Sequence, residues 1–250
     1  MRYRLYQLGW TALDWLFPPQ CGGCGTPGTR WCSNCQQEVQ KISPPVCKKC
    51  GQKIEREGLC GRCLSDPPSF TALRSWAHYE GPVRNAIHQL KYKRDVGMGE
   101  VLAGELVEYY QALGWTVDLV LPVPLGATRE SERGYNQAAL LAKPLAIATG
   151  LPYNPQALSR IRETKSQVEL SFVERQVNVA GAFQARPDLV SGKRILIVDD
   201  VATSGSTLRE CAGALLQSKA VAVYALTVAR SKFSSASPVR LDSQISYMEV

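Results

Sequence analysis

The residues best suited to chemistry are two adjacent acids, Asp199 and Asp200, and the hydroxyl-rich segment that follows them. They come after the apolar run 195–198, whose lack of polar alternation predicts a central parallel strand covered on both faces. From Leu208 onward apolar residues recur at helical spacing, so the segment leads into a helix N-terminus, where unpaired N–H groups and the helix dipole favour an anion. The sequence therefore predicts a phosphate site formed by Thr203, Ser204, Gly205, Ser206 and Thr207.

Two carboxylates beside a phosphate repel it unless they hold another group, and adjacent sugar hydroxyls are such a group. The pattern thus predicts a sugar phosphate, with its hydroxyls on Asp199 and Asp200. The segment has neither the spacing of a Walker A loop nor that of a dinucleotide fingerprint. The alternative is a buried strand and a capped helix without a ligand, and the cost of burying two adjacent acids without a partner counts against it.

Eight of the nine cysteines form four Cys-x-x-Cys pairs within residues 21–63. Two such pairs can surround one tetrahedral Zn²⁺, and a site closed by four sulfurs is structural rather than catalytic. Nothing marks the chain as secreted, which disfavours disulfides. We expect two zinc ions with sequential pairing, although interleaved pairing or loss of one metal stays open. The predicted ligands are Cys21, Cys24, Cys32 and Cys35 for one ion, and Cys47, Cys50, Cys60 and Cys63 for the other.

A second polar segment follows a second apolar run, 119–123, which predicts a neighbouring buried strand. Because strand ends of a parallel sheet meet at one edge, this segment suits a second anionic group. Its candidate residues are Arg129, Arg133, Gly134 and Asn136, although Arg133 and Asn136 could instead cap the next helix. The basic segment 160–167, which contains Lys165, lies between the two strands in sequence and is a further candidate.

The other elements follow from composition and periodicity. Residues 73–79 and 220–228 predict strands, whereas Gly81-Pro82 opens a helix and residues 96–113 predict another. The sequence Asp66-Pro67-Pro68-Ser69 predicts a junction. We therefore expect an N-terminal amphipathic helix in residues 1–20, a zinc module in 21–66, an α/β domain in 67–232 and a tail in 233–250.

Two of these stretches carry a family resemblance. Residues 195–207 resemble the phosphoribosyl pyrophosphate (PRPP) motif of type I phosphoribosyltransferases, with four apolar residues, two acids and a Thr/Ser-Gly-Ser/Thr loop. Pro122-Val123-Pro124, followed by Arg133-Gly134-Tyr135-Asn136-Gln137, resembles the signature of the ComF/GntX family of competence-related proteins. In that family a cysteine-rich ribbon precedes a phosphoribosyltransferase domain.

The resemblance implies an α/β fold of the type I phosphoribosyltransferase kind: a parallel sheet with helices on both faces, preceded by a small double zinc ribbon whose sites each have four cysteine ligands. It implies that PRPP binds with Mg²⁺, the ribose hydroxyls on Asp199 and Asp200 and the 5-phosphate on residues 203–207. The segment 125–137 would be the pyrophosphate loop, and Lys165 would lie in a mobile hood. Arg133, with Arg129 and Lys165, would then stabilise the departing pyrophosphate.

Charge and hydropathy leave the partner open. The chain has 250 residues, 45% apolar content and a net charge of +7. Residues 1–66 carry nine basic and five acidic side chains, and this excess of positive charge is large for a segment of that length. This bias is compatible with nucleic acid or phosphorylated ligands, and also with a role in solubility alone. No apolar run approaches the roughly 20 residues of a membrane span, so we expect a cytoplasmic protein.

Two functions remain at this point. The first is transfer, or sensing, of phosphoribose with an unidentified acceptor, linked to DNA uptake. The second is a non-catalytic factor of DNA processing or competence that grips single-stranded DNA, or a protein of the competence machinery, with its basic ribbon. The sequence does not predict the oligomeric state.

Overall fold

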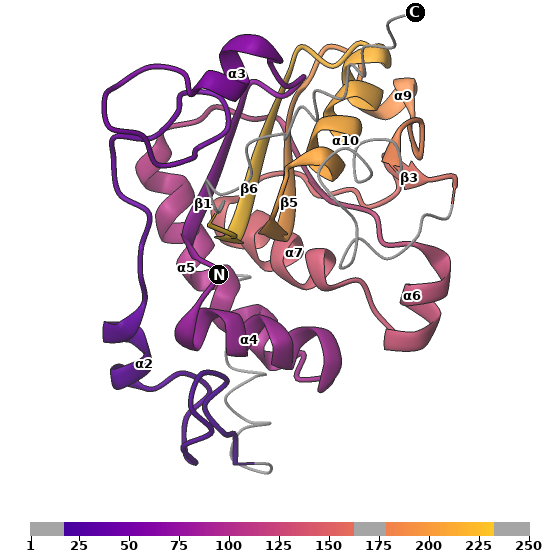
Figure 1. Cartoon of the computed structure of the whole chain (residues 1–250). Coiled ribbons are helices and arrows are strands. Elements are labelled where there is room, and N and C mark those ends of the chain that lie inside the picture. Colours follow the sequence, from indigo (N-terminus) through magenta and orange to yellow (C-terminus); the bar gives the residue numbers. More distant parts are fainter. Residues whose placement is uncertain (1–17, 163–178, 233–250) are drawn as a thin grey trace, which may run out of the picture.

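The computed structural model describes residues 18–162 and 179–232 of the chain, and Figure 1 shows their arrangement. The zinc module contains two short helices, α2 (Ser33–Glu38) and α3 (Gly61–Ser65). The elements that follow are β1 (Ala72–His78), α4 (Gly81–Tyr92), α5 (Gly97–Leu113), β2 (Leu119–Pro122), α6 (Ala127–Arg133), α7 (Gln137–Thr149), β3 (Leu158–Arg160), β4 (Phe183–Ala185), α9 (Pro187–Val190), β5 (Arg194–Ala202), α10 (Ser206–Gln217) and β6 (Ala222–Arg230).

In the described ranges the main sheet has four parallel strands in the order β1-β6-β5-β2. The two strands that bear the candidate residues are neighbours, with Leu119 opposite Ile195 and Pro122 opposite Val198. All four strands coincide with the apolar runs expected from the sequence. The parallel α/β fold with helices is thus confirmed, and the ends of β2 and β5 meet at one edge, as a ligand site in such a sheet requires.

Helices cover both faces of the sheet, which explains why β5 has no polar alternation (Figure 1). Ile195 and Ile197 are buried on the face packed by α10, whereas Leu196 and Val198 are buried on the face packed by α4, α5 and α7. Successive side chains of a strand point to opposite faces, so each layer receives every second residue. Because both faces are covered by helices, the polar candidate residues lie at the end of the sheet where β2 and β5 finish.

Strand β5 is longer than its apolar run indicates. It continues to Ala202, so that Asp199 and Asp200 lie within the strand rather than after it, and Asp199 pairs with Thr227 of β6. The pairing with β6 extends the strand, because the backbone of these residues still finds partners in the neighbouring strand. As a result, the two acids alternate like the apolar residues before them, and Asp200 continues the face that is packed by α4.

The segment between β2 and α7 also differs from the expected loop. Residues 127–133 form the short helix α6, and Gly134 ends it with a φ of 82°, a left-handed conformation that glycine adopts without steric cost. The antiparallel pair β3–β4 lies beside this edge and carries Arg160, whose guanidinium lies 5.6 Å from the centre of the Phe183 ring.

Several expectations fall on residues outside the described ranges. These are the N-terminal amphipathic helix, the tail from 233 onward, and Lys165 with most of the hood segment. They stay predictions, as do the domain boundaries. No helix in the described part of the chain combines the length and the apolar character needed to cross a membrane.

Candidate functional site

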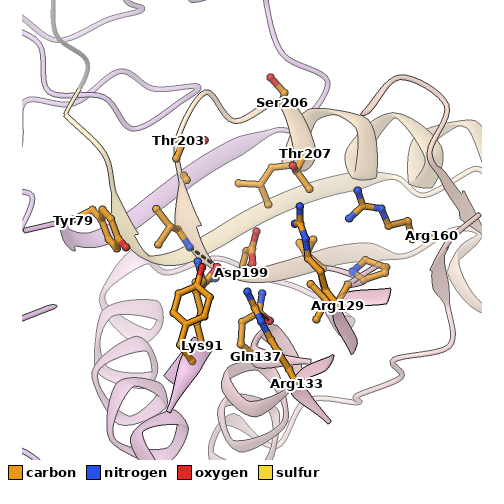
Figure 2. A pocket seen from close by; sticks show the side chains of 18 of the residues that line it. Tyr79, Lys91, Arg129, Arg133, Gln137, Arg160, Asp199, Thr203, Ser206 and Thr207 are labelled. Atoms are coloured by element: carbon orange, nitrogen blue, oxygen red, sulfur yellow. Dashed lines mark hydrogen bonds and ion pairs between the residues drawn. The ribbon is translucent and has the colours of Figure 1, made fainter. Parts of the chain in front are cut away.

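A cavity of about 820 Å³ opens at the sheet edge where β2 and β5 end. Its wall includes both acids of β5, most of the hydroxyl-rich segment and the basic residues of α6, which Figure 2 shows around one space. The acids therefore face the same cavity as the hydroxyl-rich segment, as the sugar-phosphate hypothesis requires. The polar lining residues are Tyr79, Lys91, Tyr92, Arg94, Arg129, Glu132, Arg133, Gln137, Arg160, Asp199, Asp200, Thr203, Ser206 and Thr207.

The two acids are held by a lysine that the sequence analysis did not select. Lys91, at the end of α4, places its Nζ 2.5 Å from Oδ2 of Asp200, and the side chain of Asp200 is only 5% exposed. The N–H of Asp200 donates to Oδ1 of Asp199 at 2.9 Å, and the N–H of Val201 donates to Oδ1 of Asp200 at 2.9 Å. Asp200 thus has a charged partner and a backbone donor, whereas Asp199 has a backbone donor only among these contacts.

This arrangement gives the two carboxyls different protonation states. Burial raises the pKa of Asp199 well above its ordinary value, and the adjacent charge of Asp200 raises it further. For Asp200, burial acts in the same direction, but Lys91 outweighs it and the pKa falls below its ordinary value. The pair therefore binds a proton more readily at Asp199 than at Asp200. Such a pair can both donate to and accept from adjacent hydroxyl groups.

The hydroxyl-rich segment turns from β5 into α10. Gly205 has a φ of 78°, which reverses the chain and directs the first N–H groups of α10 toward the cavity end of the helix. Thr203, Gly205, Ser206 and Thr207 line the cavity. Ser204 does not line it, because its hydroxyl turns back to Ser206 Oγ at 2.8 Å, which fixes the shape of the turn.

Helix α6 supplies the opposite wall. Arg129 points into the cavity in Figure 2, and within the described residues it makes no hydrogen bond or ion pair. Arg133 lines the cavity too, donates to Oε1 of Gln137 at 2.7 Å and lies over the ring of Tyr92. Two guanidinium groups thus face the space in front of the acids, where an anionic group would be bound.

Gly134 and Asn136 are placed differently from these arginines. Neither lines the cavity: Gly134 ends α6, and Asn136 caps α7 by accepting from the N–H of Ala138 at 2.9 Å. The amide of Asn136 also donates to the carbonyl of Val123 at 3.0 Å, which ties α7 to the end of β2. Their assignment as phosphate ligands stays a prediction, and their visible contacts are those of capping residues.

Several residues that line the cavity are not predicted by the sequence patterns, and three of them have contacts or positions of note. Lys91 belongs to a basic cluster at a helix C-terminus, a position that the helix dipole alone explains. Gln137 lies in the motif with Arg133, and its buried side chain receives that arginine's hydrogen bond. Arg160 reaches the cavity from β3. The basic cluster was the one signal for Lys91, and it did not indicate that the lysine pairs with an acid 109 positions later.

The eight paired cysteines form two clusters in the sequential arrangement. Cys21, Cys24, Cys32 and Cys35 compose the first, Cys47, Cys50, Cys60 and Cys63 the second, and in each the four sulfurs lie within 4.8 Å of one another. Sulfurs about 2.3 Å from a tetrahedral zinc would be about 3.8 Å apart. The sulfurs of Cys21 and Cys35 are 3.6 Å apart and those of Cys50 and Cys60 are 3.7 Å apart, so both clusters fit a structural zinc ion.

Backbone donors favour the thiolate form of some cysteines in each cluster, and Cys21 and Cys47 are the clearest cases. Burial opposes ionisation of Cys21, but N–H groups directed at its sulfur, among them that of Cys32 at 3.4 Å, lower its pKa to about 6. The same balance, with the N–H of Cys60 at 3.3 Å, lowers the pKa of Cys47 to about 6. Zinc binds the thiolate form, so each ribbon loop offers a partly ionised ligand at neutral pH.

The clusters predict a zinc content that can be counted. Purified protein is expected to contain two zinc ions per chain by elemental analysis, and Cys32→Ser is expected to retain about one, because each cluster binds its own ion. Cys211 is buried under α10 outside both clusters, so Cys211→Ser should retain both ions and serves as the control. Loss of both ions in Cys32→Ser would contradict separate sites.

Comparisons with known proteins agree with this organisation. Residues 12–64 match the double zinc ribbon domain family, and residues 102–245 match the phosphoribosyl transferase domain family. The DNA utilization protein YhgH of Salmonella typhimurium is 36% identical over 225 residues, which cover 86% of this chain and 98% of that protein. Competence protein F of Haemophilus influenzae is 32% identical over 187 residues, covering 72% and 81%.

Two more distant similarities were found. Competence protein ComFC of Bacillus subtilis is 27% identical over 213 residues, covering 82% of this chain and 86% of that protein. A solved structure of glutamine PRPP amidotransferase from B. subtilis is 20% identical with a TM-score of 0.41, covering 57% of this chain and 30% of that one. The chain carries a double zinc ribbon and a phosphoribosyltransferase domain in this order, and it belongs to the ComF family of competence-related proteins.

Proposed function

We propose that this competence-related protein binds PRPP with Mg²⁺ and transfers or senses its phosphoribosyl group. The observation that supports the proposal most is the shared cavity, in which the acid pair, the hydroxyl-rich turn and the α6 arginines face one space. A sugar phosphate with a second anionic group needs these three kinds of partner, at three separate places. A cavity of about 820 Å³ lies in the range of small-molecule sites and leaves room for an acceptor.

Each group of residues in the cavity wall would bind one part of PRPP. The Asp199 and Asp200 pair would hold the two ribose hydroxyls, one carboxyl donating and the other accepting. The N–H groups and hydroxyls of residues 203–207 would hold the 5-phosphate at the N-terminus of α10, where the helix dipole favours negative charge. Arg129 and Arg133 would face the diphosphate and stabilise the charge that develops on it as the glycosidic bond breaks. Bound Mg²⁺ would supply further neutralisation of the diphosphate oxygens.

The electrostatic surroundings of the two carboxyls determine whether they suit Mg²⁺ or sugar hydroxyls. Lys91 already neutralises Asp200, and burial raises the pKa of Asp199, so the pair contacts sugar hydroxyls more readily than it binds a bare cation. Catalysis would then consist of positioning and charge stabilisation, without a nucleophile from the protein. The nine cysteines are free of disulfides, which suits the reducing cytoplasm, where we place the protein.

The alternative of a DNA-gripping ribbon has less support from the contacts. Lys49 donates to the carbonyl of Phe70, Lys53 donates to the carbonyls of Ser43 and Pro44, and Arg62 donates to Ser204. These basic side chains are therefore engaged in hydrogen bonds within the protein. Lys48 and Arg56 remain exposed on the same ribbon, and they are the positions at which DNA binding would be tested.

The binding proposal predicts a selective effect at Arg129. Wild-type protein with Mg²⁺ is expected to bind both PRPP and ribose 5-phosphate in calorimetric titrations. Arg129→Met is expected to weaken PRPP binding by about 10- to 100-fold, because a charge-assisted hydrogen bond to the diphosphate is lost. Ribose 5-phosphate has no diphosphate, so its affinity should change little.

Arg84 is the matched control, because it is exposed on α4 and does not line the cavity. Arg84→Met should bind both ligands like wild type. Absence of PRPP binding in the wild type, or equal losses for both ligands in Arg129→Met, would contradict the proposal. Release of pyrophosphate from PRPP, measured with a panel of bases and nucleic acids, then separates transfer from sensing.

A further inference from the structure

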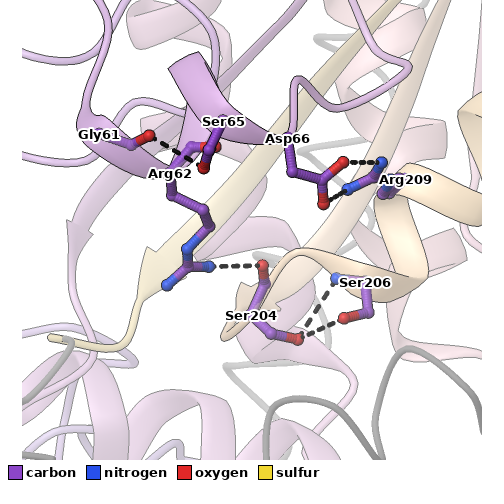
Figure 3. Close-up of polar contacts among 7 residues, drawn as sticks. All are labelled: Gly61, Arg62, Ser65, Asp66, Ser204, Ser206 and Arg209. Carbon is purple, nitrogen blue, oxygen red and sulfur yellow. Dashed lines mark hydrogen bonds and ion pairs between the residues drawn. The ribbon is translucent and has the colours of Figure 1, made fainter. Parts of the chain in front are cut away.

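The second zinc ribbon, residues 47–65, lies directly against the hydroxyl-rich turn. Figure 3 shows Arg62 of α3 directed at Ser204, and its Nη1 lies 3.5 Å from that residue's carbonyl oxygen. A small cavity of about 30 Å³ separates the ribbon from the turn, and its wall includes Cys50 and Cys63 as well as Ser204, Gly205 and Ser206. The turn that faces the candidate site on one side therefore faces a zinc cluster on the other.

Three arginines converge on this cavity, and each is bound across the boundary between the two modules. Arg62 comes from the ribbon and contacts the turn. Arg209 of α10 makes a bidentate ion pair with Asp66, at 2.5 and 2.6 Å. Arg230, at the end of β6 and only 4% exposed, donates to the carbonyl of Cys50 at 2.6 Å. These contacts join the ribbon to the turn, to α10 and to the end of β6 around one small cavity behind the turn that would hold a phosphate.

The second cluster is part of the protein core, which makes this contact rigid. Cys47, Cys50 and Cys63 are buried in the same apolar cluster as Phe70 and residues of β5 and α10. Gly51, with a φ of 71°, approaches the backbone so closely that a Cβ would lie 2.4 Å from the carbonyl oxygen of Leu73. Any larger residue there would displace the ribbon from β1.

The first ribbon packs elsewhere and provides the contrast. Its Gly23 carbonyl accepts from Asn85 of α4, and its Gln36 amide donates to Glu105 of α5 at 2.8 Å. None of the contacts found in the described residues joins it to the turn 203–207. The two clusters are alike in ligands but differ in what they support.

We propose that Arg62 is a positioning residue through which the second zinc site fixes the phosphate-binding turn. Zinc at Cys47, Cys50, Cys60 and Cys63 would fix α3, α3 positions Arg62, and Arg62 donates to the carbonyl of Ser204. A ligand held by that turn would consequently be coupled to the second ribbon and not to the first. This last step rests on the proposed function, whereas the ordering of the turn does not.

Hydrogen–deuterium exchange tests the ordering without any ligand. In Arg62→Met, the amides of residues 203–209 are expected to exchange about tenfold faster than in wild type, the size expected for loss of one hydrogen bond to a charged group. Arg62→Lys keeps the charge and a donor and should restore part of the protection. Arg56→Met, an exposed arginine of the same ribbon, should exchange like wild type.

Zinc content and the thermal midpoint show whether each variant is folded. If Arg62→Met keeps two zinc ions and the turn exchanges like wild type, the proposal is overturned. It is also overturned if protection is lost equally throughout the sheet, because Arg62 would then support the whole fold rather than the turn.

The PRPP titration adds the ligand half of the test. Arg62→Met is expected to weaken both PRPP and ribose 5-phosphate by about tenfold, since both carry the 5-phosphate, unlike the selective loss expected for Arg129→Met. If wild type binds neither ligand but the exchange result holds, the proposed function fails and the positioning role stands. If wild type binds PRPP and the Arg62 variants bind it equally well, the coupling is overturned.

Discussion

Lys91→Met is expected to lower the free energy of unfolding by about 3 kcal/mol, the lower end of the range for breaking a buried ion pair, because the lysine keeps some contact with the cavity. The change leaves the Asp200 carboxylate buried beside Asp199 without its cation. The pKa of Asp200 should rise in consequence, and PRPP affinity should fall by about tenfold or more as the acid pair loses its arrangement. Urea unfolding and calorimetric titration measure the two effects.

The pH dependence of the stability difference shows whether loss of the Lys91–Asp200 ion pair is its cause. In wild type Lys91 holds the pKa of Asp200 below its ordinary value, so Asp200 stays ionised and its contribution to stability is constant from pH 7 to about pH 4. In Lys91→Met the raised pKa lets the buried carboxylate take up a proton as the pH falls through this range, which removes the cost of its unpaired charge. The stability gap between wild type and Lys91→Met should therefore narrow from pH 7 toward pH 4. Lys93→Met, an exposed lysine at the same helix end, should leave stability and binding unchanged. A gap that stays constant with pH would indicate lost packing instead of the ion pair.

Asp199→Asn is expected to act in opposite directions on stability and on binding. The pKa of Asp199 is raised in the folded protein, so ionisation of this carboxyl opposes folding as pH rises above its ordinary value. Asparagine cannot ionise, and the variant should be more stable than wild type at pH 8 by on the order of 1 kcal/mol. PRPP binding should fall by about tenfold, because the amide reproduces only part of the hydrogen bonding of the carboxyl with the ribose.

Thermal unfolding at pH 4 and pH 8 decides the stability half of this prediction. At pH 4 the Asp199 carboxyl is already protonated in the folded state, so the variant and wild type should have nearly the same midpoint. Glu108→Gln, at an exposed position on α5, controls for the general loss of one negative charge. If the variant and wild type have equal midpoints at both pH values, ionisation of Asp199 does not oppose folding.

The sequence was sufficient to predict the sheet and the two zinc clusters, for physical reasons that are local. A run such as 195–198 has no polar alternation, and such a run is stable only when both faces of its strand are covered. Cys-x-x-Cys pairs bring two sulfurs to one metal within a single turn of chain. The hydroxyl-rich segment was likewise recognisable as a turn that leads into a helix, because small polar residues and a glycine precede the apolar periodicity of α10; its binding of an anion stays a prediction.

The remaining features depend on contacts between distant segments. Lys91 reaches Asp200 only because the chain order places α4 against the face that Asp200 continues, and no spacing in the sequence encodes this. Arg62 was grouped with basic residues that could contact nucleic acid, whereas in the structure it contacts Ser204, 142 positions away. Asn136 lies in the expected segment, but its backbone geometry makes it the cap of α7.

The burial of Cys47, Cys50 and Cys63 in the core of the sheet domain bears on how the protein is made and how it can be divided. The amino-terminal part of the chain leaves the ribosome first, yet these sulfurs complete a hydrophobic interior whose strands are synthesised last. A nascent chain, or a fragment starting after the ribbon, would present Phe70 and its neighbours to solvent. The second ribbon and the sheet domain therefore share one hydrophobic core, although they match separate families.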